Sequence, residues 1–392
     1  MAYGPGSVSF MRTFETLAGK QIVVAVTGSI AAVEVVRLIH SLRRCGAAVQ
    51  VVMSDAATGI ISPDSLTYAS GRPAITRISG MVEHVTYCGD GGSADLLLIA
   101  PCTANTISKI ACGIDDTTVT TFATTALGSG IPVLVVPAMH QSMYRHPAVN
   151  GNLECLRAWG VGVVDPRIDE GRAKIAETET IVLWCERMIL GKPLKGKRVL
   201  ITSGPCREPV DDIRVLTTRS AGLMGRALAL EAFRLGANVT VVHYDIFPCV
   251  TNVHADTAAE MGEAVRHCFS TGGADIYISA AAISDFAPKK YKGKIPSGKK
   301  THLDLEPLPK LLDEVIRRWA PVTIAFKLGA APEKKSKQMI EQGVTMVMMN
   351  EPPTMGGREG EYTFLSAKGR VQLKASKDTV AQRFWKELID LI

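Results

Sequence analysis

The sequence predicts an α/β protein with two Rossmann-like domains, each a mostly parallel sheet flanked by helices. The chain has 392 residues, about two to three times the length of one typical domain. Two segments begin alike, "LAGKQIVVAVTGS" at 17–29 and "LKGKRVLITSG" at 194–204, each with an apolar run and a small-residue turn. A helical pattern and a second apolar run follow each segment. This is the β-α-β order of a parallel sheet covered by helices.

The remaining elements repeat that order in each half. Apolar residues at helical spacing, followed by a glycine, predict helices over 34–46 and 224–236. Continuous apolar runs predict further strands at 47–53, 95–100, 133–136 and 161–164, and at 237–244, 275–280, 322–328 and 344–349. The segment 190–197 has the composition of a linker, so we expect domains over 1–190 and 191–392.

Composition excludes several classes of protein. The chain is 46% hydrophobic with a net charge of +6, and its one short basic segment, 289–300, suits a small anionic ligand better than nucleic acid. Nine scattered cysteines without a CxxC pair argue against a disulfide framework or a zinc ribbon and favour a reducing cytoplasm. No apolar run approaches the roughly 18 residues of a membrane span, and the N-terminus lacks a signal-peptide pattern. We therefore expect a cytoplasmic protein with a loose N-terminal lead-in.

Polar residues follow the predicted strands of the first half. The turn 27–29, Ser54 and the segment "APCTANT" at 100–106 come directly after three successive strands. Ligands of open α/β sheets bind beyond the carboxyl ends of the strands, and a helix N-terminus there favours a phosphate. One such turn alone would be equally well explained as a tight turn. Three of them together favour a phosphorylated cofactor.

Three motifs carry a specific resemblance. "VAVTGSIAA", "LIAPCTANTISKIACGI" and "VPAMHQSMY" together resemble the homo-oligomeric flavin-containing cysteine decarboxylases. With the second half included, from about Gly19 onward, the chain resembles the bifunctional phosphopantothenoylcysteine decarboxylase and phosphopantothenate–cysteine ligase family of coenzyme A biosynthesis. The resemblance implies that 4′-phosphopantothenate and cysteine are joined through an acyl-nucleotidyl intermediate and that the product is decarboxylated to 4′-phosphopantetheine. It also implies a homo-oligomer with trimeric decarboxylase and dimeric ligase contacts, in total a dodecamer.

The resemblance implies an FMN site and a catalytic histidine in the first half. FMN would oxidise the cysteinyl thiol to a thioaldehyde, which accepts the electrons that CO₂ leaves behind. A lone histidine is more often structural, but the position of His84 in "MVEHVTY" matches the catalytic histidine of the family, which removes protons and orients the carboxylate. The residues implied to bind FMN are Gly28, Ser29, Ile30, Ser54, Thr103, Ala104 and Asn105.

The stretch "VPAMHQSMYRHP" at 136–147 has three possible interpretations: a core cap, a metal site or a substrate clamp. A metal site is disfavoured because His140 and His146 have no Cys or Asp at ligand spacing. Most relatives have an asparagine at His140 that grips the substrate, and an imidazole also donates and accepts hydrogen bonds. We interpret the stretch as a clamp in which His140 contacts substrate during catalysis and Met139 and Met143 form an apolar wall.

A second departure concerns the stretch 165–177, "DPRIDEGRAKIAE". Many relatives carry a cysteine on a flexible flap here, which protonates the enethiolate left by decarboxylation, and this chain has none. Arg167 and Lys174 are candidates to bind substrate charge, but neither is an obvious acid. The proton donor of the reaction is therefore left open.

The segment 202–225 resembles the signature of the ligase domain. Thr218 and Leu223 replace an asparagine and a lysine of the family pattern, and Arg219 is a candidate to restore the charge. The segment 289–300 is either a solvated loop or a nucleotide lid, and its place after "SAAAISDF" favours a lid. We expect CTP, with ATP second, together with Mg²⁺ at Asp285 and Lys294 as a catalytic residue. The resemblance implies substrate contacts at Gly204, Thr218, Arg219 and Asn350, and nucleotide contacts at Ser279, Ala280, Ala281, Asp285, Lys294, Phe326 and Lys327.

Two other functions compete with this interpretation. A dehydrogenase with two Rossmann domains is disfavoured because neither half has GxGxxG followed by an acidic ribose-binding residue. A flavin-binding regulatory relative with reduced catalysis stays open, because His140 and the missing flap cysteine both depart from the family pattern.

Overall fold

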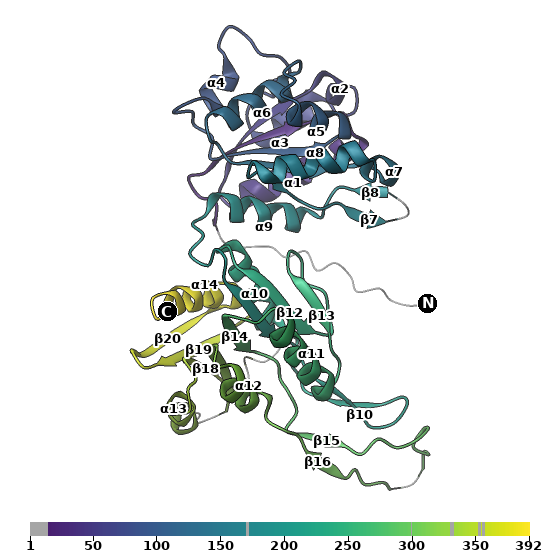
Figure 1. Ribbon diagram of the computed structural model, residues 1–392, viewed down its shortest axis with the longest axis vertical. Helices are drawn as coiled ribbons and strands as arrows, with labels where there is room; N and C mark the ends of the chain where they lie inside the picture. Colours follow the sequence, from purple (N-terminus) through teal and green to yellow (C-terminus); the bar gives the residue numbers. More distant parts are fainter. Residues whose placement is uncertain (1–14, 170–171, 299, 330–332, 352–353, 355–356) are drawn as a thin grey trace. The chain divides into compact units, whose positions relative to one another are not determined.

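The chain divides into two compact units, Met1–Leu190 and Gly191–Ile392 (Figure 1). The computed structural model describes residues 15–169, 172–298, 300–329, 333–351, 354 and 357–392. The N-terminal lead-in expected at the start of the chain therefore lies largely outside the described residues. Each unit is built on a mainly parallel sheet with packed helices, which confirms the predicted fold class.

The first unit contains a five-stranded parallel sheet in the order β2-β1-β3-β4-β6. Nearly every residue of its longer strands is buried, because helices cover both faces, and this explains the continuous apolar runs in the sequence. Four of the strands coincide with the predicted ones, and the fifth is shorter. The strands are β1 (Gln21–Val26), β2 (Ala48–Met53), β3 (Leu96–Cys102), β4 (Val133–Pro137) and β6 (Gly162–Val163).

Two sets of helices cover this sheet (Figure 1). The first set consists of α1 (Val35–Arg44), α3 (Pro63–Ser70) and α9 (Thr178–Ile189), and each of these helices buries an apolar stripe in one shared cluster. The second packs on the other cluster and consists of α4 (Glu83–Cys88), α5 (Ala104–Ala111), α6 (Thr118–Gly128) and α8 (Pro147–Ala158). Three short elements connect them: η1 (Ile30–Glu34), α2 (Asp55–Thr58) and α7 (Gln141–Tyr144).

A small antiparallel sheet joins two loops of the first unit. β5 (Met139–His140) pairs with β8 (Arg172–Lys174), which pairs with β7 (Arg167–Asp169). This pairing brings the flap stretch 165–177 beside the clamp stretch 136–147. Residues 170–171, within the flap stretch, lie outside the described residues.

The second unit contains an eight-stranded sheet in the order β13-β12-β9-β14-β17-β18-β19-β20. The strands from β13 to β18 are parallel, whereas β19 and β20 are antiparallel and close one edge. These two strands and β13, at the opposite edge, were not predicted. The strands are β9 (Arg198–Thr202), β12 (Asn238–His243), β13 (Thr251–His254), β14 (Ile276–Ser279), β17 (Val322–Leu328), β18 (Met346–Asn350), β19 (Glu359–Ser366) and β20 (Gly369–Ser376).

Helices of the second unit pack in two groups. α10 (Leu223–Arg234) lies against α14 (Lys377–Ile389), and the Trp385 indole N–H donates to the Leu228 carbonyl at 2.9 Å. A second group, α11 (Ala258–Thr271), α12 (Leu311–Trp319) and α13 (Glu333–Glu341), packs on the sheet through other apolar clusters. The carboxyl ends of the parallel strands thus lie beside the first turns of α10 and α14.

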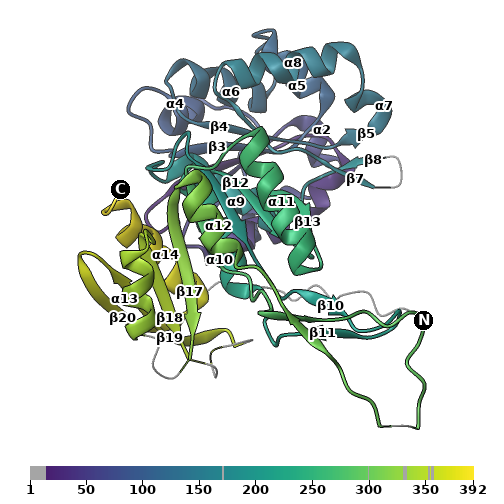
Figure 2. The same cartoon turned by 60° about the horizontal axis from the view of Figure 1, so that its bottom comes forward.

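Two short hairpins extend away from this sheet (Figure 2). One pairs β10 (Arg207–Pro209) with β11 (Val215–Thr217), and the other pairs β15 (Phe286–Pro288) with β16 (Leu305–Pro307). Within the part of the chain that the structure describes, no helix has the length and apolar character needed to cross a bilayer. The nine cysteines are thiols and form no disulfide.

Candidate functional site

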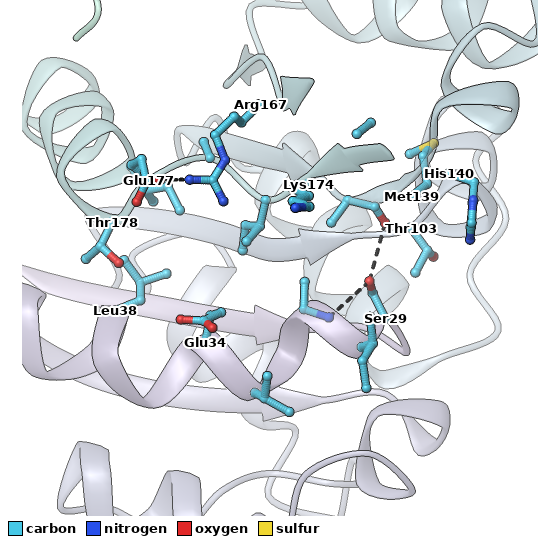
Figure 3. A pocket seen from close by; sticks show the side chains of 18 of the residues that line it. Ser29, Glu34, Leu38, Thr103, Met139, His140, Arg167, Lys174, Glu177 and Thr178 are labelled. Carbon is cyan, nitrogen blue, oxygen red and sulfur yellow. Dashed lines mark hydrogen bonds and ion pairs between the residues drawn. The ribbon is translucent and has the colours of Figure 1, made fainter. Parts of the chain in front are cut away.

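A cavity of about 790 Å³ lies at the carboxyl edge of the first sheet (Figure 3). Its walls come from the turns after β1 and β3, from η1 and from the first part of α1. The clamp stretch and the hairpin of β7 and β8, here called the flap hairpin, complete them. β1 and β3 are neighbours in the sheet, and the chain winds outward from them in opposite directions. Ligands of doubly wound sheets bind at this kind of switch point.

The turn after β1 forms one wall of the cavity. A Cβ placed on Gly28 would lie 2.6 Å from Ala56 Cβ, so the close approach of this turn to α2 requires a glycine. Ser29 Oγ accepts from the Ala31 amide and donates to the Ala138 carbonyl, both at 3.4 Å (Figure 3). These bonds fix a hydroxyl and the start of η1 at the cavity.

The turn after β3 forms the neighbouring wall. Thr103 is the N-cap of α5, and its hydroxyl accepts from the Thr106 amide at 3.3 Å. The Thr103 amide donates to Thr27 Oγ1 at 3.1 Å, which ties this turn to the end of β1. The first turn of α5 therefore presents a helix N-terminus to the cavity, where anionic groups are favoured.

The residues predicted to bind FMN are only partly brought together here. Ser54 is buried at the start of α2, and its hydroxyl has no hydrogen-bond partner among the described residues. A buried hydroxyl without a partner is costly, so a ligand that reaches it would be stabilised. Asn105 is exposed on α5 and outside the cavity wall. The predicted residues that line the cavity are Gly28, Ser29, Ile30, Thr103 and Ala104.

His84 does not line this cavity. It lies on α4, where its ring meets Phe122 edge-to-face at 6.4 Å between ring centroids. Its Nδ1 is buried and has no hydrogen-bond partner among the residues described. His84 therefore lies apart from the predicted flavin contacts that line this cavity, and its catalytic role stays a prediction.

The two histidines of the clamp stretch have different surroundings. His140 is exposed on β5 and lines the cavity together with Met139 and Met143, and its imidazole bonds to no other described residue. His146 is the N-cap of α8, and its Nδ1 accepts from the Ala148 amide at 3.2 Å. The His140 side chain is thus available to a ligand of the cavity, whereas His146 has a local structural role.

The flap hairpin supplies charge to the cavity. Arg167 forms an ion pair with Glu177, and Lys174 lines the same cavity (Figure 3). Glu34 faces the same space from η1. Among the described lining residues there is no cysteine, so an acid for protonation has to come from another group.

A second cavity, of about 580 Å³, lies between the start of α10, which follows β9 in the chain, and the carboxyl ends of β14, β17 and β18. It reaches the point between β9 and β14 where the order of the second sheet reverses, the equivalent switch point of this unit. The predicted residues that line it are Thr218, Ser279, Ala280, Ala281, Asp285, Phe326, Lys327 and Asn350.

The start of α10 closes tightly on β9 at this cavity. Gly222 has a φ of +67°, and a Cβ on Gly225 would lie 2.1 Å from Ser203 Oγ. Ser203 Oγ in turn donates to the Gly222 carbonyl at 3.3 Å. Gly204 packs behind this turn and is not part of the cavity wall. The turn presents main chain to the cavity, as a phosphate requires.

Two further predicted residues lie outside the second cavity. Arg219 is exposed and does not line it. Lys294 is exposed on the segment between β15 and β16, and its neighbour Ile295 donates its amide to Asp211 Oδ2 at 3.0 Å. Lys294 therefore lies outside the wall of this cavity, and its contact with a nucleotide stays a prediction.

Sequence analysis missed two cationic residues of this cavity, Lys310 and Lys377. Lys310 forms an ion pair with Asp285, the predicted metal ligand. Mg²⁺ in nucleotide sites takes one or two carboxylates and completes its shell with phosphates and water. In the part of the chain described, no group of three or more His, Cys, Asp or Glu side chains could hold a metal, so Asp285 would need the phosphates of a bound nucleotide.

Comparison with known proteins identifies the family. The "Flavoprotein" family model matches residues 11–189, and the model described as "DNA/pantothenate metabolism flavoprotein C-terminal domain" matches residues 194–391. The coenzyme A biosynthesis bifunctional protein CoaBC of Thermococcus kodakarensis is 43% identical over 385 residues, 95% of each chain. The chain belongs to the CoaBC family.

A second CoaBC protein agrees with this assignment. CoaBC of Methanocaldococcus jannaschii is 37% identical over 392 residues and covers 96% of this chain and 95% of its own. Among solved structures, the C-terminal domain of a CoaBC protein covers 51% of this chain and 98% of its own, with 28% identity and a TM-score of 0.44. The first half is a flavoprotein domain, and a flavin is its cofactor.

Proposed function

We propose that the second domain joins 4′-phosphopantothenate to cysteine and that the first domain decarboxylates the product to 4′-phosphopantetheine. The observation that carries this proposal is the full-length match to bifunctional coenzyme A biosynthesis proteins, in a chain with a ligand-sized cavity at the switch point of each sheet. Nine thiols suit a reducing compartment, so we assign both reactions to the cytoplasm.

FMN is the flavin we propose for the first cavity. The main chain after β1 and the N-terminus of α5 are suited to its phosphate, and the unpaired Ser54 hydroxyl is a further donor nearby. When bound, the flavin would supply the two-electron oxidation of the substrate thiol and the matching reduction that the decarboxylation needs. The residues of the protein hold the substrate, exclude water and transfer protons.

Side chains of the clamp and flap would hold the substrate of this reaction. His140 donates one hydrogen bond and accepts another, while Met139 and Met143 keep water from the reacting carbon. Arg167 and Lys174 supply positive charge for the substrate carboxylate or phosphate. Because Arg167 is paired with Glu177, substrate binding competes with that ion pair.

A homo-oligomer would explain the position of His84. The exposed apolar side chain of Ile30 (78% exposed) lies at the cavity rim, and that of Met81 (75% exposed) lies just before α4. Apolar surface of this kind on both segments favours burial against a second copy. We propose that His84 of one subunit acts at the cavity of another. If His84→Asn and Ser29→Ala each release no CO₂ alone, mixing the two proteins should restore activity in mixed oligomers.

The second cavity is the proposed ligase site. The turn before α10 is suited to a nucleotide phosphate, and Asp285 would hold Mg²⁺ once Lys310 has shifted to a phosphate. We propose CTP as the nucleotide, with ATP as the alternative. Catalysis here consists mainly of positioning two substrates and neutralising phosphate charge.

The test supplies the purified protein with 4′-phosphopantothenate, cysteine, Mg²⁺ and either CTP or ATP. Formation of phosphopantothenoylcysteine, pyrophosphate and a nucleoside monophosphate establishes the ligase and identifies the nucleotide. Formation of 4′-phosphopantetheine establishes the decarboxylase. A protein that binds flavin but makes neither product would be the regulatory relative instead.

A further inference from the structure

Lys377 is the first residue of α14 and lines the second cavity, although it is only 9% exposed. A lysine is almost never buried to this degree without an anionic partner. We propose that Lys377 binds a phosphate group of a ligase substrate. This inference rests on the proposed ligase function, which supplies two phosphate-bearing molecules, the nucleotide and 4′-phosphopantothenate.

No described residue neutralises Lys377. Its amide donates to the Arg358 carbonyl at 3.0 Å, and among the residues described its ammonium has no ion pair or hydrogen bond. The other lysines of the cavity differ from it. Lys310 is paired with Asp285, and Lys327 is less buried and keeps more contact with water. Burial lowers the pKa of Lys377, so its charged form lacks a stabilising partner in this structure.

The surroundings of Lys377 favour an anion for a second reason. α10 and α14 pack side by side, joined by the Trp385–Leu228 hydrogen bond, and both begin at the carboxyl edge of the sheet. The first turn of α10 and Lys377 line the same cavity. Two helix N-termini place partial positive charge there, which repels the ammonium and attracts a phosphate. A bound phosphate would pair with the Lys377 ammonium and would also offset the repulsion between this ammonium and the helix N-termini.

A purely structural lysine would behave differently from a ligand-binding one. A buried ammonium without a partner destabilises the ligand-free fold, so replacing it with an apolar chain of similar length should leave the second domain as stable or make it more stable. The same replacement should weaken phosphate binding. A lysine required for packing or capping would lower stability when replaced.

The experiment compares Lys377→Met, Lys377→Gln and Lys377→Arg with the wild-type chain, using Lys374→Gln as the matched control. Lys374 is exposed on β20, three residues away and outside the cavity, so its variant loses the same charge. Steady-state ligase kinetics give the KM for CTP and for 4′-phosphopantothenate separately. Calorimetry gives the unfolding temperature without ligand and the affinity for inorganic pyrophosphate.

The expected result is a rise of about ten- to a hundredfold in one of the two KM values for Lys377→Met and Lys377→Gln, the size of one lost charge-assisted contact. A rise for CTP identifies the nucleotide as the source of the phosphate, and a rise for 4′-phosphopantothenate identifies the acid substrate. Lys377→Arg should restore most of the affinity, and Lys374→Gln should match the wild type. The unfolding temperature of Lys377→Met should equal or exceed that of the wild type.

Several outcomes would overturn the proposal. They are unchanged KM values for both phosphate-bearing substrates, a change confined to cysteine or kcat, or a clear loss of stability in Lys377→Met. If the wild type makes no amide with either nucleotide, the proposed ligase function fails instead. The affinity for pyrophosphate then tests the phosphate-binding role of Lys377 by itself. Weaker binding by Lys377→Met than by the wild type supports this role, and equal binding contradicts it.

Discussion

Asp211 Oδ2 accepts a hydrogen bond from the Ile295 amide at 3.0 Å, although 84 residues separate the two in the chain. The other oxygen of the buried Asp211 carboxylate accepts from the amides of Ile213 and Arg214 at 2.8 and 2.6 Å. One carboxylate thus holds the segment that carries Lys294 to the turn between β10 and β11. The position of Lys294 therefore depends on Asp211.

The first prediction concerns the pH dependence of this connection. Burial alone would raise the pKa of Asp211, but the amides of Ile295, Ile213 and Arg214 and the Arg214 charge lower it from 3.8 to about 2. Because the folded pKa lies below the unfolded one, the carboxylate stabilises the fold at pH above about 4, and this contribution is lost as pH falls toward 2. The Ile295 amide resonance should stay constant from pH 7 to 4 and shift below it.

Asp211→Asn should reproduce the low-pH behaviour at neutral pH. The uncharged amide accepts fewer of these hydrogen bonds, so the segment 289–295 loosens and the ligase KM for the nucleotide rises. Asp256→Asn is the matched control, because Asp256 bonds to Arg207 of the same hairpin and, among the described residues, to none of the segment 289–295. Equal nucleotide KM values for the two variants would mean that Asp211 does not position the segment.

The second prediction concerns Lys294 itself. If this residue contacts the nucleotide, Lys294→Gln removes one charge-assisted contact and should cost about 1.5–3 kcal/mol, or roughly ten- to a hundredfold in ligase kcat/KM. Lys292→Gln, an exposed lysine of the same segment, should change the rate little. Indistinguishable rates for the two variants would make 289–300 a solvated loop.

The third prediction separates chemistry from flavin binding at His84. His84→Asn should keep the flavin absorbance, because no residue predicted to bind the cofactor is altered, but should abolish CO₂ release from phosphopantothenoylcysteine. The ligase lies in the other domain and should keep its rate. Loss of bound flavin in this variant would assign His84 a structural role instead.

The fourth prediction concerns the two clamp histidines. His140→Asn should retain substantial decarboxylase activity, whereas His140→Ala should lose about 1–3 kcal/mol of substrate or transition-state binding. His146→Ala should cost about 1 kcal/mol of folding stability through the lost cap of α8 and leave decarboxylation nearly unchanged. A chelator should stop only the Mg²⁺-dependent ligase. Inhibition of decarboxylation by the chelator would show that the clamp holds a metal.

Much of the fold was predictable because the parallel strands are buried on both faces. Continuous apolar runs such as 95–100 and 322–328 therefore correspond to β3 and β17. The three-residue strands of the β10–β11 and β15–β16 hairpins carry too few residues for a periodic pattern. Long-range bonds such as Asp211–Ile295 hold these hairpins, and local sequence does not encode those bonds.

The candidate sites were predictable where residues directly follow parallel strands, because those strand ends share one edge of a sheet. Ser29 and Thr103 were found in this way, and both line the first cavity. Lys377 was missed because it follows an antiparallel edge strand, and the sequence "ASKD" resembles an ordinary helix start with an exposed lysine. That side chain is buried by the packing of α14 in the folded domain, which the local sequence does not show.

The central claim, that one chain first ligates and then decarboxylates, is tested by cysteine labelled at its carboxyl carbon. The wild-type protein with flavin, Mg²⁺, 4′-phosphopantothenate and CTP should release labelled CO₂, and release should stop when the nucleotide is omitted. His84→Asn should instead accumulate labelled phosphopantothenoylcysteine. Labelled CO₂ that appears without nucleotide or without 4′-phosphopantothenate, or no labelled product with either CTP or ATP, would contradict the account.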